Sequence, residues 1–399
     1  MRDLRLLTLV SLLVFSAMGL TMPVMTVYLE TLGASYAEIS LILTSFTLTA
    51  LLSNYASGWL SDRVRRRKPL LAVALLLIAI AYIWLGRVLD ATQAWPLRIL
   101  EGIGSGAYGT LSLAMTGDLL EHSNRRGRLM GMLRGVGSAA FAVGAVAGGW
   151  LATHFSSPFV FVVAGACYAA AALVMLAVRE RSPADVAGER TTTEPLGAPS
   201  GYWGLSLPAL FLGGVFLWMA STSAVTSMWA NAMRSLGYSQ QTISTLWGFA
   251  ALIEFPGMTF TGIISDAVGR PPLLAAGAVG VAVVFLAYNF FAQWLPALVG
   301  AQVGRGLSYG SYLANAMTYT AEHANPLTRG SVSGVFSAAS GGGQLAGMLA
   351  GGLIVQAFGF TWLFVTCSLA ALVAAACFIA LHSNETNQRN RNSVTETAK

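Results

Sequence analysis

Gly58-Trp-Leu60-Ser-Asp62-Arg63-Val-Arg65-Arg66-Arg67 and Gly262-Ile-Ile-Ser-Asp266-Ala-Val-Gly269-Arg270 are two copies of one short motif. In each copy a glycine is followed four residues later by an aspartate, and arginine follows within the next turn. A spacing that is kept along the chain predicts an internal duplication. Other pairs keep nearly the same spacing: Leu32-Gly33 with Leu236-Gly237, Arg126-Gly127 with Arg329-Gly330, and Gly144, Gly148 and Gly149 with Gly347, Gly351 and Gly352.

Long apolar segments surround both copies of the motif. Of the 399 residues, 55% are hydrophobic and 10% are charged, whereas soluble domains carry about 25% charged residues. A helix needs about 20 apolar residues to cross a membrane, and near-continuous apolarity favours helices over the alternating strands of a β-barrel. Twelve such segments are expected, near 4–29, 37–60, 69–89, 94–118, 129–153, 158–178, 203–229, 241–264, 272–292, 296–319, 331–356 and 360–381.

The duplication divides these segments into two halves. We expect an all-α polytopic membrane protein with two pseudo-symmetric six-helix bundles, 1–178 and 203–381. The polar segment 179–202 is predicted to be a cytoplasmic linker, and the tail 382–399 is predicted to be disordered. The first apolar segment is too long for a signal peptide and is expected to be retained.

Basic residues gather in the loops on one side of the predicted helices. The formal net charge is +6, but this clustering indicates membrane topology and not nucleic-acid binding. By the positive-inside rule, both termini and the linker are expected to face the cytoplasm.

The paired motif resembles the loop signature of the major facilitator superfamily of transporters. Arg65 stands where the family has a glycine, whereas the second copy keeps Gly269. The resemblance implies two six-helix bundles that open a central cavity alternately to either side of the membrane. It also implies that this loop is a conformational latch in which Arg66 pairs with Asp118. The alternative is that the loop is a solvated cluster of charges that only sets the membrane topology. Latch candidates are Gly58, Asp62, Arg63, Arg66, Asp118, Gly262, Asp266, Gly269 and Arg270.

Ionisable residues inside the predicted helices are candidates for proton coupling or substrate binding. Arg98 and Glu101 share one helical face, in a motif similar to one of proton-coupled family members, although Glu101 replaces a glutamine. Glu254 has no basic residue one turn away, and Arg305 is expected at membrane depth, where it would pair with Glu254 or bind an anion. The alternatives are a permanent Arg98–Glu101 ion pair and a protonated, structural Glu254.

Flexible and aromatic side chains are candidates for lining an adaptable cavity. Packing against lipid or within the core remains the alternative for each of them. These candidates are Met22, Met25, Trp229, Tyr309 and Tyr312.

Motifs for chemistry are missing from the sequence. It contains no phosphate-binding Gly-x-x-x-x-Gly-Lys-Ser loop, no metal-ligand spacing and no catalytic triad, so we expect neither an enzyme nor a cofactor. The resemblance implies a monomer in the plasma or inner membrane, driven by the proton gradient. The favoured function is proton-coupled efflux of amphipathic, drug-like compounds; the alternatives are sugar or metabolite transport, by efflux or proton symport, and lipid flipping.

Overall fold

The computed structural model describes residues 2–64, 66–120, 126–178, 207–324 and 329–397. Side chains are described in these ranges except at 62, 117–134, 329–330 and 388–397. Within these ranges the chain forms twelve α-helices and no strand, which confirms the predicted fold class. The expected linker 179–202 lies outside the described residues.

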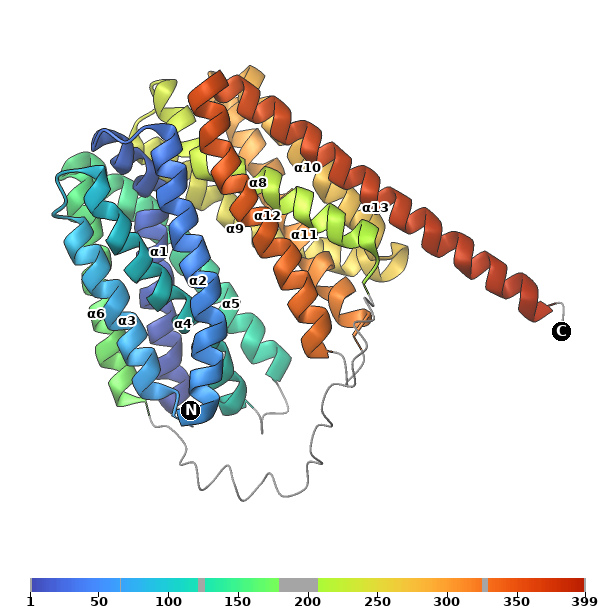
Figure 1. Cartoon of the computed structure of the whole chain (residues 1–399), viewed down its shortest axis with the longest axis horizontal. Coiled ribbons are helices and arrows are strands. Elements are labelled where there is room, and N and C mark those ends of the chain that lie inside the picture. The colour runs from blue at the N-terminus through green and yellow to red at the C-terminus, as the bar shows by residue number, and fades with distance from the viewer. Residues whose placement is uncertain (1, 65, 121–125, 179–206, 325–328, 398–399) are drawn as a thin grey trace. The chain divides into compact units, whose positions relative to one another are not determined.

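The helices follow the predicted apolar segments (Figure 1). The first six are α1 (Arg2–Thr31), α2 (Tyr36–Val64), α3 (Lys68–Leu85), α4 (Ala94–Leu120), α5 (Arg126–His154) and α6 (Ser157–Ala177), with a short 3-10 helix η1 (Ala91–Gln93) before α4. The second six are α8 (Ala209–Ser235), α9 (Gln240–Val268), α10 (Arg270–Phe291), α11 (Leu295–Glu322), α12 (Arg329–Phe358) and α13 (Phe360–Thr397).

Helix ends are set by proline and glycine. Proline occupies the first turn of α3, α6, α10 and α11, where its missing N–H costs no hydrogen bond. Gly33 and Gly237 follow α1 and α8 with φ of 86° and 89°, a left-handed conformation that stops a helix and that suits glycine. These two positions are related by the duplication, so both halves end their first helix in the same way.

Ten of the described helices are long and apolar enough to cross a membrane. The two others are α4 and α11, which the duplication also relates to each other. Charged residues and several glycines lower their hydropathy: Arg98 and Glu101 lie in α4, and Arg305 lies in α11. The two helices that are least suited to lipid therefore carry Arg98, Glu101 and Arg305.

The chain folds into two compact units. Unit 1 contains residues 1–34, 42–204 and 239–248, and unit 2 contains residues 35–41, 205–238 and 249–399. Each unit thus includes the first turns of a helix whose remainder belongs to the other unit, which differs from the uninterrupted halves expected from the sequence. Within unit 1, the Gln240 amide donates a hydrogen bond to the Pro23 carbonyl at 2.9 Å, so these turns carry specific side-chain contacts.

The helix packing of unit 1 recurs in unit 2. In unit 1, α1 packs against α5 and α6, and α3 packs against α4 and α6; in unit 2, α8 packs against α12 and α13, and α10 packs against α11 and α13. Glycines bring the backbones together: Gly144 lies on the Ser16 carbonyl, and Gly347 lies in the same way on the Ala220 carbonyl. Such contacts favour association where lipid gives no hydrophobic driving force.

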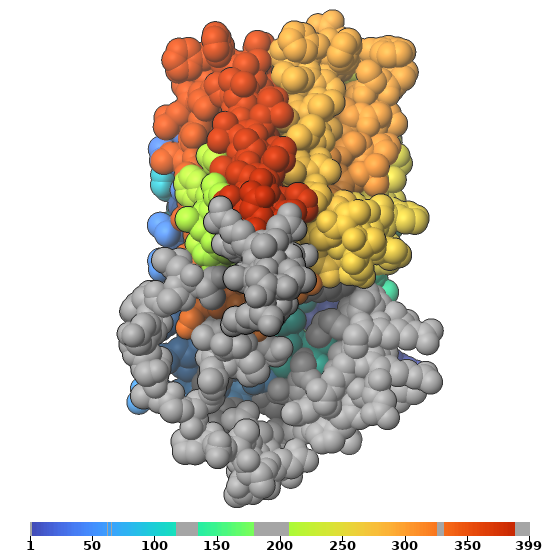
Figure 2. Space-filling view, turned by 90° about the vertical axis from the view of Figure 1, so that its right-hand side faces the viewer, coloured from blue at the N-terminus to red at the C-terminus, as the bar shows by residue number. Residues whose placement is uncertain are grey.

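The surface of the helices is apolar, as expected for contact with lipid. On α13, large side chains are exposed at Trp362, Leu369, Val373 and Ile379, about one or two turns apart. Figure 2 shows α13 in red on one face of unit 2, beside the start of α8 in light green.

The last helix is longer than expected. The tail 382–399 was predicted to be disordered from its polar composition, whereas α13 continues as one helix to Thr397 (Figure 1). No glycine or proline follows Phe360, so nothing in the sequence interrupts a helix that the apolar segment has already nucleated.

Replacing Gly347 by alanine tests the backbone contact between α8 and α12. A methyl group there overlaps the Ala220 carbonyl, and overpacking of this kind costs about 1–3 kcal/mol. We expect a lower thermal unfolding midpoint in detergent. The matched control in the same helix is Gly334→Ala, which meets no neighbour; it should not lower the midpoint, and equal losses in both variants would contradict the packing.

Candidate functional site

Unit 1 encloses the charged pair predicted on α4. Arg98 and Glu101 are each 5% exposed, and an Arg98 nitrogen donates to Glu101 Oε2. The other carboxylate oxygen, Oε1, accepts a hydrogen bond from the Tyr82 hydroxyl at 2.7 Å. The guanidinium also lies 4.2 Å from the ring centroid of Phe46, a cation–π distance. Every polar atom of the Glu101 side chain therefore has a partner.

Tyr82 joins this pair to the surrounding helices. Its hydroxyl lies 3.2 Å from Thr21 Oγ1 on α1, and its ring stacks on Tyr168 of α6 with centroids 5.5 Å apart. No motif in the sequence indicated Tyr82, because the contact depends on how α3 packs against α4.

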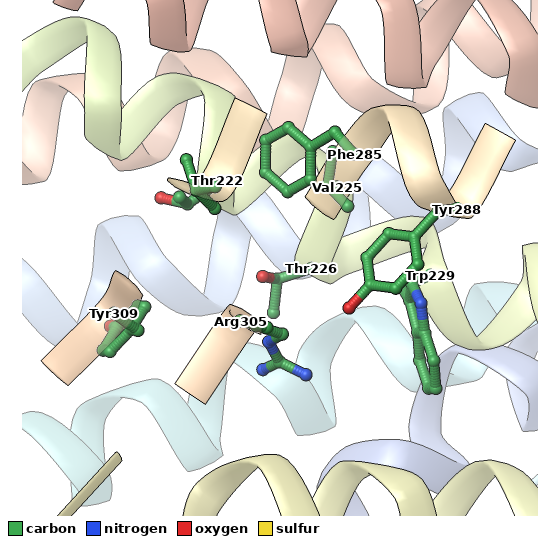
Figure 3. Close-up of a pocket in the computed structure, with 9 residues that line it drawn as sticks. Thr222, Val225, Thr226, Trp229, Phe285, Tyr288, Arg305 and Tyr309 are labelled. Atoms are coloured by element: carbon green, nitrogen blue, oxygen red, sulfur yellow. The ribbon is translucent and has the colours of Figure 1, made fainter. Parts of the chain in front are cut away.

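Unit 2 contains a pocket between α8, α10 and α11 (Figure 3). Aromatic rings, two threonine hydroxyls and one arginine surround it. The space between them admits about one water molecule, so a larger ligand requires these helices to separate. The lining residues are Thr222, Val225, Thr226, Trp229, Val281, Phe285, Tyr288, Arg305 and Tyr309.

Arg305 lines the pocket together with Tyr288 and lies one turn after Gln302 on α11. The Tyr288 hydroxyl donates a hydrogen bond to Gln302 Oε1 at 3.3 Å, and Arg305 interacts electrostatically with Tyr288. Glu254 of α9 is half-buried and attracts Arg305 electrostatically. Figure 3 shows the Tyr288 hydroxyl on the side of the Arg305 guanidinium. The predicted pairing of the Glu254 and Arg305 side chains stays a prediction.

Gln302 and Tyr288 were missed by the sequence reasoning. Gln302 is fully buried one turn before Arg305, and a polar amide inside an apolar helix was the available signal. No comparable signal marks Tyr288 in the sequence.

Two of the five predicted cavity residues, Trp229 and Tyr309, line the pocket. Tyr312 is buried in a stack on Trp218, with ring centroids 3.5 Å apart. Met22 and Met25 belong to α1 in unit 1 and are not part of the pocket lining; Met22 is 45% exposed and Met25 is buried.

The second copy of the paired motif forms an ionic cluster in unit 2. Arg270 contacts Asp266 at 2.7 Å and Glu322, at the end of α11, at 3.0 Å. Gly269 adopts φ of 90°, which supports the turn between α9 and α10. A methyl group on Gly262 would meet no neighbour.

The first copy is less completely described. Arg63 and Arg66 are exposed, and Arg63 lies 5.4 Å from the Trp59 ring centroid. A methyl group on Gly58 would make only ordinary contact with Thr110. The side chains of Asp62 and Asp118 lie outside the described residues, so the predicted contact between Arg66 and Asp118 stays a prediction. Glu322 lies in the last turn of α11 as Asp118 lies in the last turn of α4, and the contact of Glu322 with Arg270 corresponds to the predicted contact of Asp118 with Arg66.

The ten long apolar helices define a class: a multi-pass membrane protein. Within that class, residues 4–366 match the model of the MFS_1 like family. The chain belongs to this family of the major facilitator type, which confirms the resemblance in the paired motif.

Relatives with known names cover almost the whole chain. A Deinococcus radiodurans protein named "Putative sugar efflux transporter" is 27% identical over 92% of this chain and 95% of its own length. The multidrug resistance protein MdtG of Salmonella arizonae is 25% identical over 94% and 93%. A crystal structure of the nucleoside transporter NupG has a TM-score of 0.78, 15% identity and coverage of 96% and 99%. The last similarity concerns the fold alone.

Removing one partner of the buried pair in unit 1 should destabilise the protein. Arg98→Met leaves the Glu101 carboxylate buried without its cation, a change that costs about 3–5 kcal/mol. The double variant Arg98→Met with Glu101→Gln is uncharged and keeps an acceptor for Tyr82, so its thermal midpoint in detergent should return close to that of the wild type. A double variant as unstable as the single one would contradict this account.

Proposed function

We propose that this protein moves small hydroxylated solutes of the sugar type out of the cell, coupled to protons, through the pocket of unit 2. The observation that carries the proposal is the lining of that pocket. The lining combines the aromatic side chains of Trp229, Phe285, Tyr288 and Tyr309 with the hydroxyls of Thr222, Thr226 and Tyr288 and with the guanidinium of Arg305.

This set of groups suits the two surfaces of a sugar. The C–H faces of a sugar ring are apolar and pack on aromatic side chains such as Trp229 and Phe285. Its hydroxyls need both donors and acceptors, which threonine and tyrosine supply, and arginine adds up to five donors in a fixed plane.

A carboxylate beside the pocket supplies a group for proton coupling. Glu254 attracts Arg305 electrostatically, and intramembrane carboxyls near a cation gain or lose a proton when that cation moves. Protonation of Glu254 changes how strongly Arg305 is held, and Arg305 lines the pocket. This linkage makes the solute affinity depend on the proton.

Outward direction is supported by the relative from Deinococcus radiodurans, whose name refers to sugar efflux. A second candidate is efflux of amphipathic, drug-like compounds, the function favoured by the sequence. The apolar side chains of Val225, Val281 and Phe285 in the pocket and the similarity to MdtG support this candidate.

The proposal includes the setting of the protein. It acts as a monomer in the plasma or inner membrane, with both termini in the cytoplasm, as the distribution of basic loop residues supports. The proton gradient is its energy source, and no cofactor takes part.

The substrate class is tested by counterflow in proteoliposomes. Purified protein is assayed with radiolabelled glucose, lactose and maltose, and in parallel with the amphipathic dye ethidium. Exchange of a sugar but not of ethidium supports the main proposal, whereas exchange of ethidium alone supports the second candidate. Accumulation of the sugar in everted vesicles with an acidic interior tests direction, and accumulation only in right-side-out vesicles would overturn efflux.

Thr226→Val should weaken binding of the exchanged sugar. Loss of one neutral hydrogen bond corresponds to about a three- to tenfold loss of affinity, measured as the sugar concentration at half-maximal counterflow. The matched control is Thr366→Val on α13, because the Thr366 hydroxyl donates to the Trp362 carbonyl of its own helix and lies outside the pocket. Equal effects of both variants would remove Thr226 from the site.

A further inference from the structure

Large aromatic side chains fill the space between α8 and α11 in unit 2. Near the start of α8, Phe211 packs on Tyr319 with ring centroids 4.4 Å apart. Two turns further along α8 and two turns earlier on α11, Trp218 stacks on Tyr312 with ring centroids 3.5 Å apart. The reversed order of the partners shows that the two helices run in opposite directions, so their facing side chains meet in layers two turns apart.

The pocket is the layer in which this aromatic filling is interrupted. Two turns beyond Trp218 on α8 and two turns before Tyr312 on α11 lie Val225 and Arg305, which both line the pocket. Tyr309 also belongs to the lining, and it packs on Trp218 with ring centroids 5.2 Å apart. The stack of Trp218 on Tyr312 therefore lies directly beside the pocket, at the end nearer the start of α8.

Both rings of this stack carry a polar atom that packing leaves unsatisfied. Trp218 is 0% exposed and Tyr312 is 2% exposed. Within the part of the chain that the structure describes, neither Trp218 Nε1 nor the Tyr312 hydroxyl has a hydrogen-bond partner. A buried polar group without a partner destabilises the folded protein. Phenylalanine rings would fill this layer without that penalty, so filling space does not explain why the two residues carry an N–H and a hydroxyl.

The geometry of the stack is also that of a site that can open. The two rings are 9° from parallel and face each other directly, whereas aromatic pairs prefer offset or edge-to-face arrangements with centroids roughly 4.5–7 Å apart. A guest ring between the two faces requires them to be about 7–8 Å apart, which is twice an ordinary contact distance. Such a ring would contact an aromatic face on each side and meet the indole N–H and the phenol hydroxyl at its edge.

We propose that Trp218 and Tyr312 form a second binding subsite, beside the pocket, which takes the second ring of a disaccharide. The C–H faces of a sugar ring pack on the two aromatic faces. Its hydroxyls accept from Trp218 Nε1 and exchange a hydrogen bond with the Tyr312 hydroxyl. The assignment rests on the proposed function and narrows its substrate class from sugars in general to sugars of two rings.

One movement opens the pocket and the subsite together. The pocket admits about one water molecule, so a sugar enters only when its helices separate. Trp218 and Thr222 lie one turn apart on α8, and Tyr309 and Tyr312 lie one turn apart on α11. Figure 3 shows Thr222 and Tyr309 on the same side of the pocket. A separation of α8 from α11 that admits the first ring therefore also parts Trp218 from Tyr312.

The first experiment needs no solute. Tyr312→Phe removes the unsatisfied hydroxyl and keeps the ring, so the thermal unfolding midpoint of the purified protein in detergent should rise by about 2–4 °C. The matched control is Tyr28→Phe, because the buried Tyr28 hydroxyl lies 3.1 Å from the Leu85 carbonyl and 3.3 Å from the Val88 carbonyl; its midpoint should fall. A midpoint of Tyr312→Phe at or below that of the wild type overturns the proposal, since the hydroxyl would then have a partner in the empty protein.

The second experiment measures binding through the stabilisation that a sugar gives to the purified protein. Maltose and glucose are compared, and maltose should bind more tightly to the wild type. The ratio of the maltose Kd to the glucose Kd should rise about three- to tenfold in Tyr312→Phe and in Trp218→Phe, which keeps a ring but loses the N–H. Tyr28→Phe should keep the wild-type ratio, and Thr226→Val should weaken the binding of both sugars. Equal binding of the two sugars to the wild type, or an unchanged ratio in either stack variant, makes the stack a mere end wall of the pocket and overturns the proposal.

Counterflow separates the subsite from the proposed function. Proteoliposomes that contain the wild type are assayed with radiolabelled maltose and glucose. If maltose binds with the expected ratios but neither sugar is exchanged, sugar transport is overturned and the subsite stands. If glucose is exchanged but maltose does not bind more tightly than glucose, sugar transport stands and the subsite is overturned. If neither sugar binds, both proposals are overturned.

Discussion

Contact between helix backbones through glycine is the constraint on which the rest of both units depends. Lipid does not drive helices together by excluding water, so close van der Waals contact must do so. Gly144 and Gly347 provide this contact on α5 and α12. Gly102 and Gly306 provide it on α4 and α11, directly beside the charged residues. The packing that stabilises each unit therefore also fixes where Glu101 and Arg305 lie.

The duplication gave the two units the same helix arrangement, and later substitutions gave them different charged residues. A carboxylate in unit 1 is replaced at the corresponding position by Arg305 in unit 2, and the acid of unit 2 lies on another helix. The result is one closed network around Glu101 and one network that opens onto a pocket through Arg305.

The sequence predicts the fold well because each helix that crosses the membrane must be a long apolar segment, which is visible in the local composition. Apolar length specifies the spans, and the repeat specifies their grouping. The sequence predicts the contact between Arg98 and Glu101 equally well, because this contact depends only on a spacing of one helical turn. It does not predict Tyr82, Tyr288 or the Gln302 contact, because these depend on how neighbouring helices rotate against each other. The helical tail was missed because composition alone does not show whether a helix continues.

The low hydropathy of α4 and α11 bears on how the chain enters the membrane. A charged residue at the centre of a single helix costs about 2.5–3.5 kcal/mol on insertion, and α4 carries two. Once α3 and α4 enter as a hairpin, Tyr82 meets Glu101 while Arg98 neutralises it. The α10–α11 hairpin joins Tyr288 to Gln302, one turn before Arg305. Each poorly inserting helix therefore has a tyrosine on the preceding helix as a polar partner.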